Sequence, residues 1–191
     1  MILSLLAILP TADAGLAPLA PAQEASLAAG EVLLLDHTPS HAGGVSVEGI
    51  ADVAASADAV WAALLDFQAR LKGNSSVKSF AYYRTSTPTE EWGVWEVSHF
   101  GFSVTYHNHY LLDRADGSLI HELDASQPND LTWSRGVYTL GTSPNNPQWQ
   151  RLSYVVDTDF GAAIPGFIKS WLCGQGVKDY LVDLVHRAEG A

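Results

Sequence analysis

The sequence predicts an α+β fold in which a curved antiparallel β-sheet wraps around a long C-terminal α-helix. Three observations support this prediction. Residues 164–186 carry apolar side chains at helical spacing, a short helical pair begins at residue 57 after the first main strand, and residues 77–160 contain strands separated only by turns. Because no helices lie between those strands, an antiparallel meander fits the order better than a parallel sheet does.

Length and composition are those of one ordinary domain with some additional N-terminal sequence. The chain has 191 residues, of which 47% are hydrophobic and 10% aromatic, enough for a sizeable core. Ten basic against 21 acidic residues give a net charge of −11. Such a surface repels phosphate backbones and anionic lipid headgroups, which excludes nucleic acid as a partner and disfavours stable docking to a membrane. Transient membrane contact and a buried lipid ligand are compatible with this charge, and we expect a monomer.

The N-terminal residues resemble a secretory signal peptide. Residues 2–9 are an apolar core, shorter than the about 20 residues that span a bilayer, and residues 12–14 are a small-x-small cleavage pattern. A cytoplasmic location is the alternative to a periplasmic or secreted one, because no Lys or Arg precedes Arg70 and signal peptides usually begin with basic residues. We expect a signal peptide at 1–14, a linker rich in Ala and Pro at 15–26, and one ligand-binding domain at 27–191.

The predicted elements follow in order along the chain. Residues 31–38 form a short apolar run before Pro39. Residues 45–52 alternate between a small or apolar set and a mostly polar set of side chains. Both segments are therefore predicted to be strands. Ser56 is a candidate N-cap for the helix at 57–67. Further strands are predicted at 77–84, on the two sides of a turn at Gly101 within 91–112, at 119–124 after the Asp116-Gly117 turn, at 130–140 and at 148–160.

The apolar stripe of the C-terminal helix changes side at Gly174 and Gly176. The first part of the stripe consists of Ile164, Phe167, Ile168, Trp171 and Leu172, and the second of Val177, Tyr180, Leu181, Leu184 and Val185. Each glycine costs roughly 1 kcal/mol relative to Ala in a helix interior. Two explanations are open: the glycines give room for a ligand or a kink, or two separate helices meet there or a sheet side chain packs closely.

Strict alternation on both sides of Gly101 assigns the faces of the central hairpin. One face is aromatic and weakly polar, and we predict that it is the inner face; it carries Trp95, Val97, His99, Val104, Tyr106, Asn108 and Tyr110. The other face holds the charge and is predicted to face solvent; it carries Val94, Glu96, Ser98, Thr105, His107 and His109.

Three segments resemble the START-like superfamily, whose helix-grip fold includes polyketide cyclases, coenzyme-Q-binding proteins and lipid-transfer proteins. The superfamily's opening strand, small-residue turn and first helix are similar to VEGIADVAASADAVWAALLDF at 47–67, and its sheet-to-helix junction to TDFGAAIPGFIKSW at 158–171. A Gly-x-Trp strand of the superfamily is similar to SRGVYTL at 134–140, with Tyr138 in place of the Trp. The resemblance covers about residues 27–188, and its motifs specify fold better than activity because they are structural.

The resemblance implies a cavity between the sheet and the C-terminal helix, typically for an apolar or lipid-like molecule, and it requires no cofactor. Together with the inner-face assignment it gives the candidate ligand-binding residues Trp95, Val97, His99, Tyr106, Asn108, Tyr110, Arg135, Phe167, Ile168 and Trp171. Arg135 shares a face with Trp133 and Val137. Directed inward, its guanidinium would anchor a carboxylate or phosphate; directed outward, it is a solvated surface residue.

His99 and Tyr106 are the candidate catalytic residues. An interior His beside a Tyr could act as general acid and base in a cyclase or dehydratase, whereas in a binding protein the two would hydrogen-bond each other or water. Cys173, the single cysteine, could be a thiol nucleophile, but a small apolar residue in the helix is the simpler interpretation.

His107, His109 and Glu96 are the candidate metal ligands, since two imidazoles and a carboxylate could hold zinc. A His-x-His pair alone is a weak motif, and we expected Glu96 to be the cross-strand neighbour of His107 on the solvent face. Exposed polar side chains on the outer face of the sheet are the ordinary explanation of these residues, so we predict no metal site.

The leading hypothesis is a non-catalytic protein that binds, and in some cases transfers, a lipid or other hydrophobic small molecule. The alternative is a polyketide cyclase or dehydratase that acts on an aromatic or polyketide substrate in the same cavity. A third hypothesis is an interaction module without an internal ligand, which a cavity too small for any ligand would favour.

Overall fold

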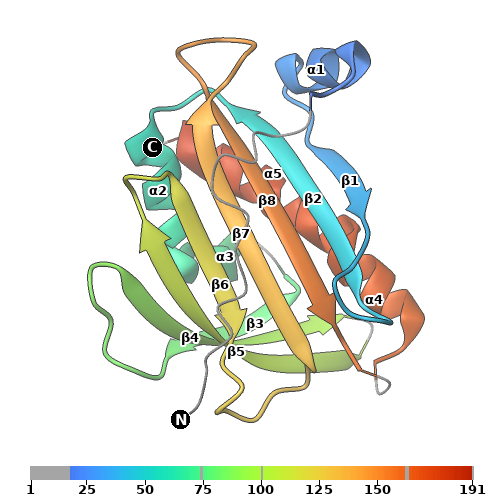
Figure 1. Ribbon diagram of the computed structural model, residues 1–191. Helices are drawn as coiled ribbons and strands as arrows, with labels where there is room; N and C mark the ends of the chain where they lie inside the picture. The colour runs from blue at the N-terminus through green and yellow to red at the C-terminus, as the bar shows by residue number, and fades with distance from the viewer. Residues whose placement is uncertain (1–17, 74, 100, 162–163, 191) are drawn as a thin grey trace, which may run out of the picture.

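One sheet of eight antiparallel strands, in the order β1-β2-β8-β7-β6-β5-β4-β3, forms the body of the domain (Figure 1). The computed structural model describes residues 18–190 except 74, 100, 162 and 163. The strands are β1 (Leu33–His37), β2 (Val45–Val53), β3 (Val77–Tyr82), β4 (Glu90–His99), β5 (Phe102–Asp113), β6 (Ser118–Leu123), β7 (Trp133–Thr142) and β8 (Gln150–Asp159). The helices are α1 (Pro21–Ala28), α2 (Ala57–Leu65), α3 (Phe67–Gly73), α4 (Gly166–Cys173) and α5 (Gln175–Glu189). The predicted α+β fold, with its curved antiparallel sheet and short helical pair, is confirmed.

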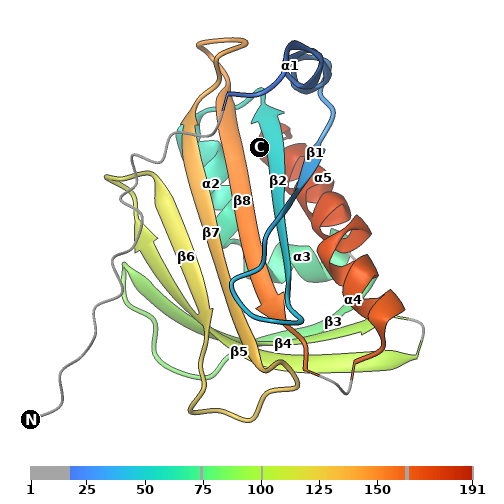
Figure 2. The same cartoon turned by 45° about the vertical axis from the view of Figure 1, so that its right-hand side comes forward.

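The concave face of the sheet is closed by α4 and α5. Figure 2 shows β3, β4 and β5 curling below these helices while α5 runs along β2. Gly49 of β2 allows this close approach, because a Cβ at that position would collide with Leu181 Cδ1 and would lie 3.3 Å from Val177 Cγ1. Leu181 is completely buried. The glycine in the first main strand is therefore a packing requirement of the last helix.

The C-terminal helical region is two helices, not one. Gly174 has φ −95° and ψ −96°, which ends α4, and α5 begins at the next residue. A Cβ on Gly174 would lie 2.9 Å from the backbone oxygen of Ser170, the same oxygen that accepts a hydrogen bond from Gly174 N. Of the explanations left open by the sequence, the structure supports the meeting of two helices at the glycines. The change of side in the apolar stripe arises because each helix buries its own face.

The β4–β5 hairpin confirms the assignment of the inner face. Gly101 forms its turn with φ +81°, a conformation that favours glycine. Trp95 pairs with Tyr106 across the strands, and Trp95, Asn108 and Tyr110 are each no more than 3% exposed.

The expected pairing of Glu96 with His107 is wrong. Glu96 lies opposite Thr105, and His107 lies opposite Val94. The register follows from the turn at Gly101: Ser98 pairs with Ser103 and His99 with Phe102, so Glu96 and His107 are two positions out of line.

The N-terminal part of the described chain is helical and is attached to the sheet. Residues 21–26, predicted as part of a linker, belong to α1, which has Pro21 in its first turn. The predicted signal peptide, residues 1–14, lies outside the described residues. In the part of the chain that the structure describes, no helix combines the length and apolar character that spanning a bilayer requires.

A buried ionic cluster holds α1 on the outer face of the sheet. Arg151 of β8 donates to Asp52 of β2 at 2.7 Å and to Glu24 of α1 at 2.7 Å. Asp52 is 4% exposed and Arg151 6% exposed. Burial raises the pKa of Asp52, but hydrogen bonds from Arg151, Asn145 and Ser143 outweigh this effect and leave the pKa below its ordinary value. The cluster therefore requires its charges to stay paired.

We predict that Arg151→Leu lowers the free energy of unfolding by about 3–5 kcal/mol, because it leaves the buried Asp52 carboxylate without its partner. The matched control is Arg135→Leu on the neighbouring strand, whose ion pair with Glu122 is partly exposed, and which should cost no more than about 1 kcal/mol. Urea unfolding of both variants measures the difference.

The stability that the ionised Asp52 contributes should decrease as the pH falls. Because the folded-state pKa of Asp52 is depressed, its contribution is present above its unfolded pKa of about 3.9 and is lost as pH falls through the folded-state pKa. The difference in the free energy of unfolding between wild type and Arg151→Leu should therefore become smaller in acid. Equal losses for the two arginine variants at neutral pH would contradict the role assigned to the cluster.

Candidate ligand-binding cavity

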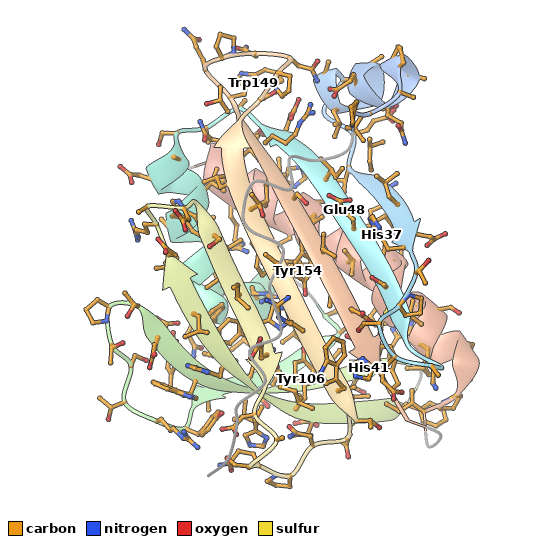
Figure 3. The ribbon with its side chains drawn as sticks, in the orientation of Figure 1. His37, His41, Glu48, Tyr106, Trp149 and Tyr154 are labelled. Atoms are coloured by element: carbon orange, nitrogen blue, oxygen red, sulfur yellow. The ribbon has the colours of Figure 1, made fainter. Side chains whose placement is uncertain are left out.

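A cavity of about 120 Å³ lies between the concave face of the sheet and helices α3, α4 and α5. Its apolar walls are Trp95, Val97, Val104, Leu131, Val156, Phe160, Leu172, Cys173 and Val177. Its polar walls are Arg70, Tyr106, Asn108, Tyr110, His121, Ser134, Tyr138, Tyr154 and Thr158. Figure 3 labels Tyr106 of β5 and Tyr154 of β8, two of the strands that contribute to it. The cavity that the resemblance implies between sheet and helices is thus present, and six of its eighteen described lining residues are Trp, Tyr or Phe.

Five of the candidate ligand-binding residues line this cavity. They are Trp95, Val97, Tyr106, Asn108 and Tyr110, all from the β4–β5 hairpin. Alternation along two regular strands was sufficient to place them, because the turn at Gly101 fixes which side chains share a face. Their contact with a ligand stays a prediction.

Four other candidates from the hairpin and α4 lie outside the cavity lining. His99 stacks on Trp171 with ring centroids 3.6 Å apart, so the two rings form a contact between β4 and α4. Ile168 is buried elsewhere in the packing of α4. Phe167 is 55% exposed and packs edge-on against Phe102. The residues of α4 that line the cavity are Leu172 and Cys173.

Arg135 faces outward, which corrects its inclusion among the ligand-binding candidates. Its Nε donates to Glu122 on the adjacent strand at 2.9 Å. Its neighbour Ser134 lines the cavity, so alternation along β7 directs Arg135 to the opposite face. The open alternative of a surface arginine is the one that the structure supports.

The three candidate metal ligands do not converge. His107 contacts Asn129 and Tyr83, His109 stacks on Trp92, and Glu96 accepts from Ser79. Among the described residues, no group of three or more His, Cys, Asp or Glu side chains is arranged to hold a metal ion.

Sequence reasoning missed Arg70, the one arginine or lysine among the described cavity residues. Its guanidinium lies over the rings of Tyr180, at 3.8 Å, and Trp95, at 4.6 Å. Its Nε is inaccessible to solvent and has no hydrogen-bond partner. No Asp or Glu lines the cavity among the described residues, so no carboxylate there balances this charge. Arg70 lies three residues after Phe67 in α3. Nothing in this local pattern predicts that its side chain extends to the sheet.

His121 of β6 is the second residue that the sequence did not single out. It lies opposite Gly136, and a Cβ on Gly136 would collide with His121 Nε2, so the glycine makes the space for the imidazole. Asn108 Nδ2 donates to His121 Nδ1 at 3.4 Å, which places the ring proton on Nε2, and Nε2 donates to Tyr154 Oη at 2.9 Å. A glycine facing a histidine is a signal visible only once the strand pairing is known.

The charge state of this network is set by burial and by Arg70. Burial, together with the positive charges of Arg70 and Arg135, lowers the pKa of His121 to about 3. Burial also raises the pKa of Tyr106 and Tyr110 above the ordinary value. The imidazole is therefore neutral and the phenols are protonated at neutral pH. The cavity presents one fixed positive charge and several neutral hydrogen-bonding groups.

Further hydrogen bonds and ring stacking hold the polar wall in place. Trp95 Nε1 donates to Tyr110 Oη at 2.7 Å. Tyr138 and Tyr154 stack with centroids 4.0 Å apart and an interplanar angle of 5°. Asn108 Oδ1 is buried without a partner, so it is available to accept from a bound molecule.

Cys173 lines the cavity but is not arranged as a nucleophile. Burial, together with the negative charge of Asp157, raises the pKa of its thiol to about 12. The reactive thiolate is therefore scarce at neutral pH.

Comparisons with known proteins rest on structure. No protein-family model and no curated protein matches the sequence. A STAR-related lipid transfer protein fragment from Xanthomonas axonopodis has a TM-score of 0.65 at 15% identity, over 82% of this chain and 93% of that one. The Zhui aromatase/cyclase from Streptomyces sp. R1128 has a TM-score of 0.61 at 18% identity, over 77% and 92%. A START superfamily protein from Mycobacterium smegmatis has a TM-score of 0.60 at 20% identity, over 76% and 97%. At these identities the likeness establishes the fold.

We predict that His121 stays neutral well into the acid range. Its imidazole ¹⁵N shifts should not change between pH 7 and about pH 4.5, whereas the same residue in the urea-unfolded chain should titrate near 6.5. Because the unfolded state binds this proton first, the contribution of His121 to stability decreases as pH falls from about 6.5 toward 3. A folded-state midpoint near 6 would show that the ring is solvated.

Proposed function

Because the chain has the START-like, helix-grip fold, we propose that it binds an apolar small molecule whose anionic or carbonyl oxygen is placed against Arg70. The observation that carries this proposal is the Arg70 guanidinium, which faces the cavity with an inaccessible and unpartnered Nε. A buried cation is costly unless it is paired and hydrogen-bonded. The rings of Tyr180 and Trp95 offset part of that cost, and a ligand oxygen supplies the missing acceptor.

The rest of the cavity suits the apolar part of such a ligand. Aromatic and aliphatic side chains contribute about 25 cal/mol per Å² of apolar surface removed from water. A dry cavity of roughly 150 Å³ can hold benzene, so a cavity of about 120 Å³ takes a ring-sized group. Pockets for larger ligands have roughly 300–1,000 Å³. A long lipid would therefore require α4 or its flanking segments to move.

A cyclase or dehydratase is the second candidate, and the pairing of Arg70 with a hydrogen-bonded His121 in one cavity is what favours it. In this reading Arg70 polarises a carbonyl and His121 moves a proton. His99 is not in a position to do so, because it lies under Trp171 outside the cavity. A pKa near 3 makes His121 a weak base at neutral pH, which favours binding over proton abstraction. The two solved relatives described as a lipid transfer protein and an aromatase/cyclase fit one candidate each.

We predict that benzoate, a ring with one carboxylate, binds the wild-type chain and binds Arg70→Met about 10- to 100-fold more weakly. The estimate corresponds to one charge-assisted hydrogen-bond interaction of about 1.5–3 kcal/mol. Arg135→Met is the control, because that arginine lies on the outer face, and its affinity should equal that of wild type. Isothermal titration measures all three, and equal affinities for Arg70→Met and wild type would refute the proposed anchor.

Native mass spectrometry of protein from its own compartment, followed by solvent extraction, identifies the physiological ligand. The proposal expects about one acidic or carbonyl-bearing apolar molecule per chain. An enzyme is indicated if the chain converts that molecule and His121→Gln abolishes conversion while binding persists. A purely hydrocarbon ligand would contradict the role of Arg70.

A further inference from the structure

A second pocket shares Tyr110 as a lining residue with the first cavity. It has a volume of about 140 Å³, and its lining residues come from the C-terminal end of α2, the loop before β4, and strands β4, β5 and β6. Tyr110 borders both pockets, but its hydroxyl is engaged by Trp95 and Asn108 in the first. The two spaces therefore share a wall and differ in their polar groups.

Glu91 of β4 provides the polar group of the second pocket. It pairs with Tyr110 across the strands and lies on the same face of β4 as Trp95. Its Oε2 is inaccessible to solvent and has no hydrogen-bond partner. Burial raises the pKa of this carboxyl group above its ordinary value, and no neighbouring donor counteracts that effect among the described residues.

The adjacent residue shows what an ordinary surface carboxylate does on this strand. Glu90 also borders the pocket, but its side chain is 41% exposed, and its Oε2 lies 3.9 Å from His109 Nε2. Its carboxylate is in contact with solvent, whereas Oε2 of Glu91 is not. The contrast between two neighbouring glutamates indicates that the position of Glu91, and not the local acidity, leaves its oxygen unsatisfied.

No cation of the described chain occupies the place opposite Glu91. Arg114 borders the pocket, but its side chain is 56% exposed and its nearest carboxylate is that of Asp58, at 4.0 Å. The remaining walls include Leu65, Leu112 and Leu119, which are apolar. The pocket thus combines an inaccessible carboxylate oxygen with an aliphatic wall.

We propose that this second pocket binds a small aliphatic amine, with the ammonium group on Glu91 and the alkyl group against the three leucines. A carboxylate accepts hydrogen bonds only, so it selects a donor, and a cationic donor also neutralises the buried charge. The first cavity, whose fixed charge is the positive Arg70, selects the opposite kind of group. The proposed amine site therefore does not depend on the function proposed above, and each can be tested separately.

Titration of the methyl-labelled chain with isobutylamine at neutral pH tests the proposal. Saturable chemical-shift changes are expected at Leu65, Leu112 and Leu119. Glu91→Gln should weaken isobutylamine binding about tenfold or more, because it removes the charge while keeping the shape of the side chain. Glu96→Gln is the matched control, because Glu96 lies on the same strand but outside the pocket lining, and it should leave the affinity unchanged.

Isobutanol, the neutral isostere, separates charge recognition from filling of an apolar space. We expect it to bind wild type and Glu91→Gln equally and more weakly than the amine binds wild type. The Glu91→Gln spectrum with isobutanol also shows whether the variant keeps its pocket. Equal affinity of wild type for amine and alcohol, retained amine binding by Glu91→Gln, or no saturable shift at the three leucines would each overturn the proposal.

Discussion

The close approach of α5 to β2 is the constraint on which the rest of the structure depends. Gly49 lets Leu181 pack directly on the strand, and Gly174 then separates α5 from α4 so that each helix buries its own apolar face. Beyond this contact the sheet curves, so that β3, β4 and β5 lie below the helices (Figure 2). The cavity lies where that curvature exceeds what the side chains can fill, with Val177 next to both the contact and the cavity.

Both proposed binding sites rest on a charged side chain with a buried, unpartnered atom. Arg70 and Glu91 each present an inaccessible polar atom without a partner, one cationic and one anionic, in the two pockets that share Tyr110. Arg151, by contrast, pairs its buried charge with Asp52 and Glu24. Because an unpaired buried charge is costly, Arg70 and Glu91 mark the places in the two pockets where a bound molecule would contribute most.

Local pattern was enough to determine the class of the fold and the inner face of one hairpin. Alternation around Gly101 placed Trp95, Asn108 and Tyr110 correctly, because strand periodicity is a property of the backbone alone. The Ser56 cap was equally local, and its hydroxyl accepts from Ala59 N at 3.3 Å. The helix at 21–28 was not predicted, and its hydrogen bond with the distant Arg151 is a contact that no local pattern reveals.

The sequence by itself determined most of the elements, their order and the part of the cavity wall that the β4–β5 hairpin provides. Only the tertiary structure decided that Arg70 enters the cavity, that His121 occupies the space above Gly136, and that Arg135 points outward. These placements depend on strand pairing and on the packing of the short helix α3 against the sheet. Both are contacts between residues that are distant in sequence. Periodicity fixes which neighbours share a face, whereas packing fixes which faces meet, and the chemistry of the site depends on the second.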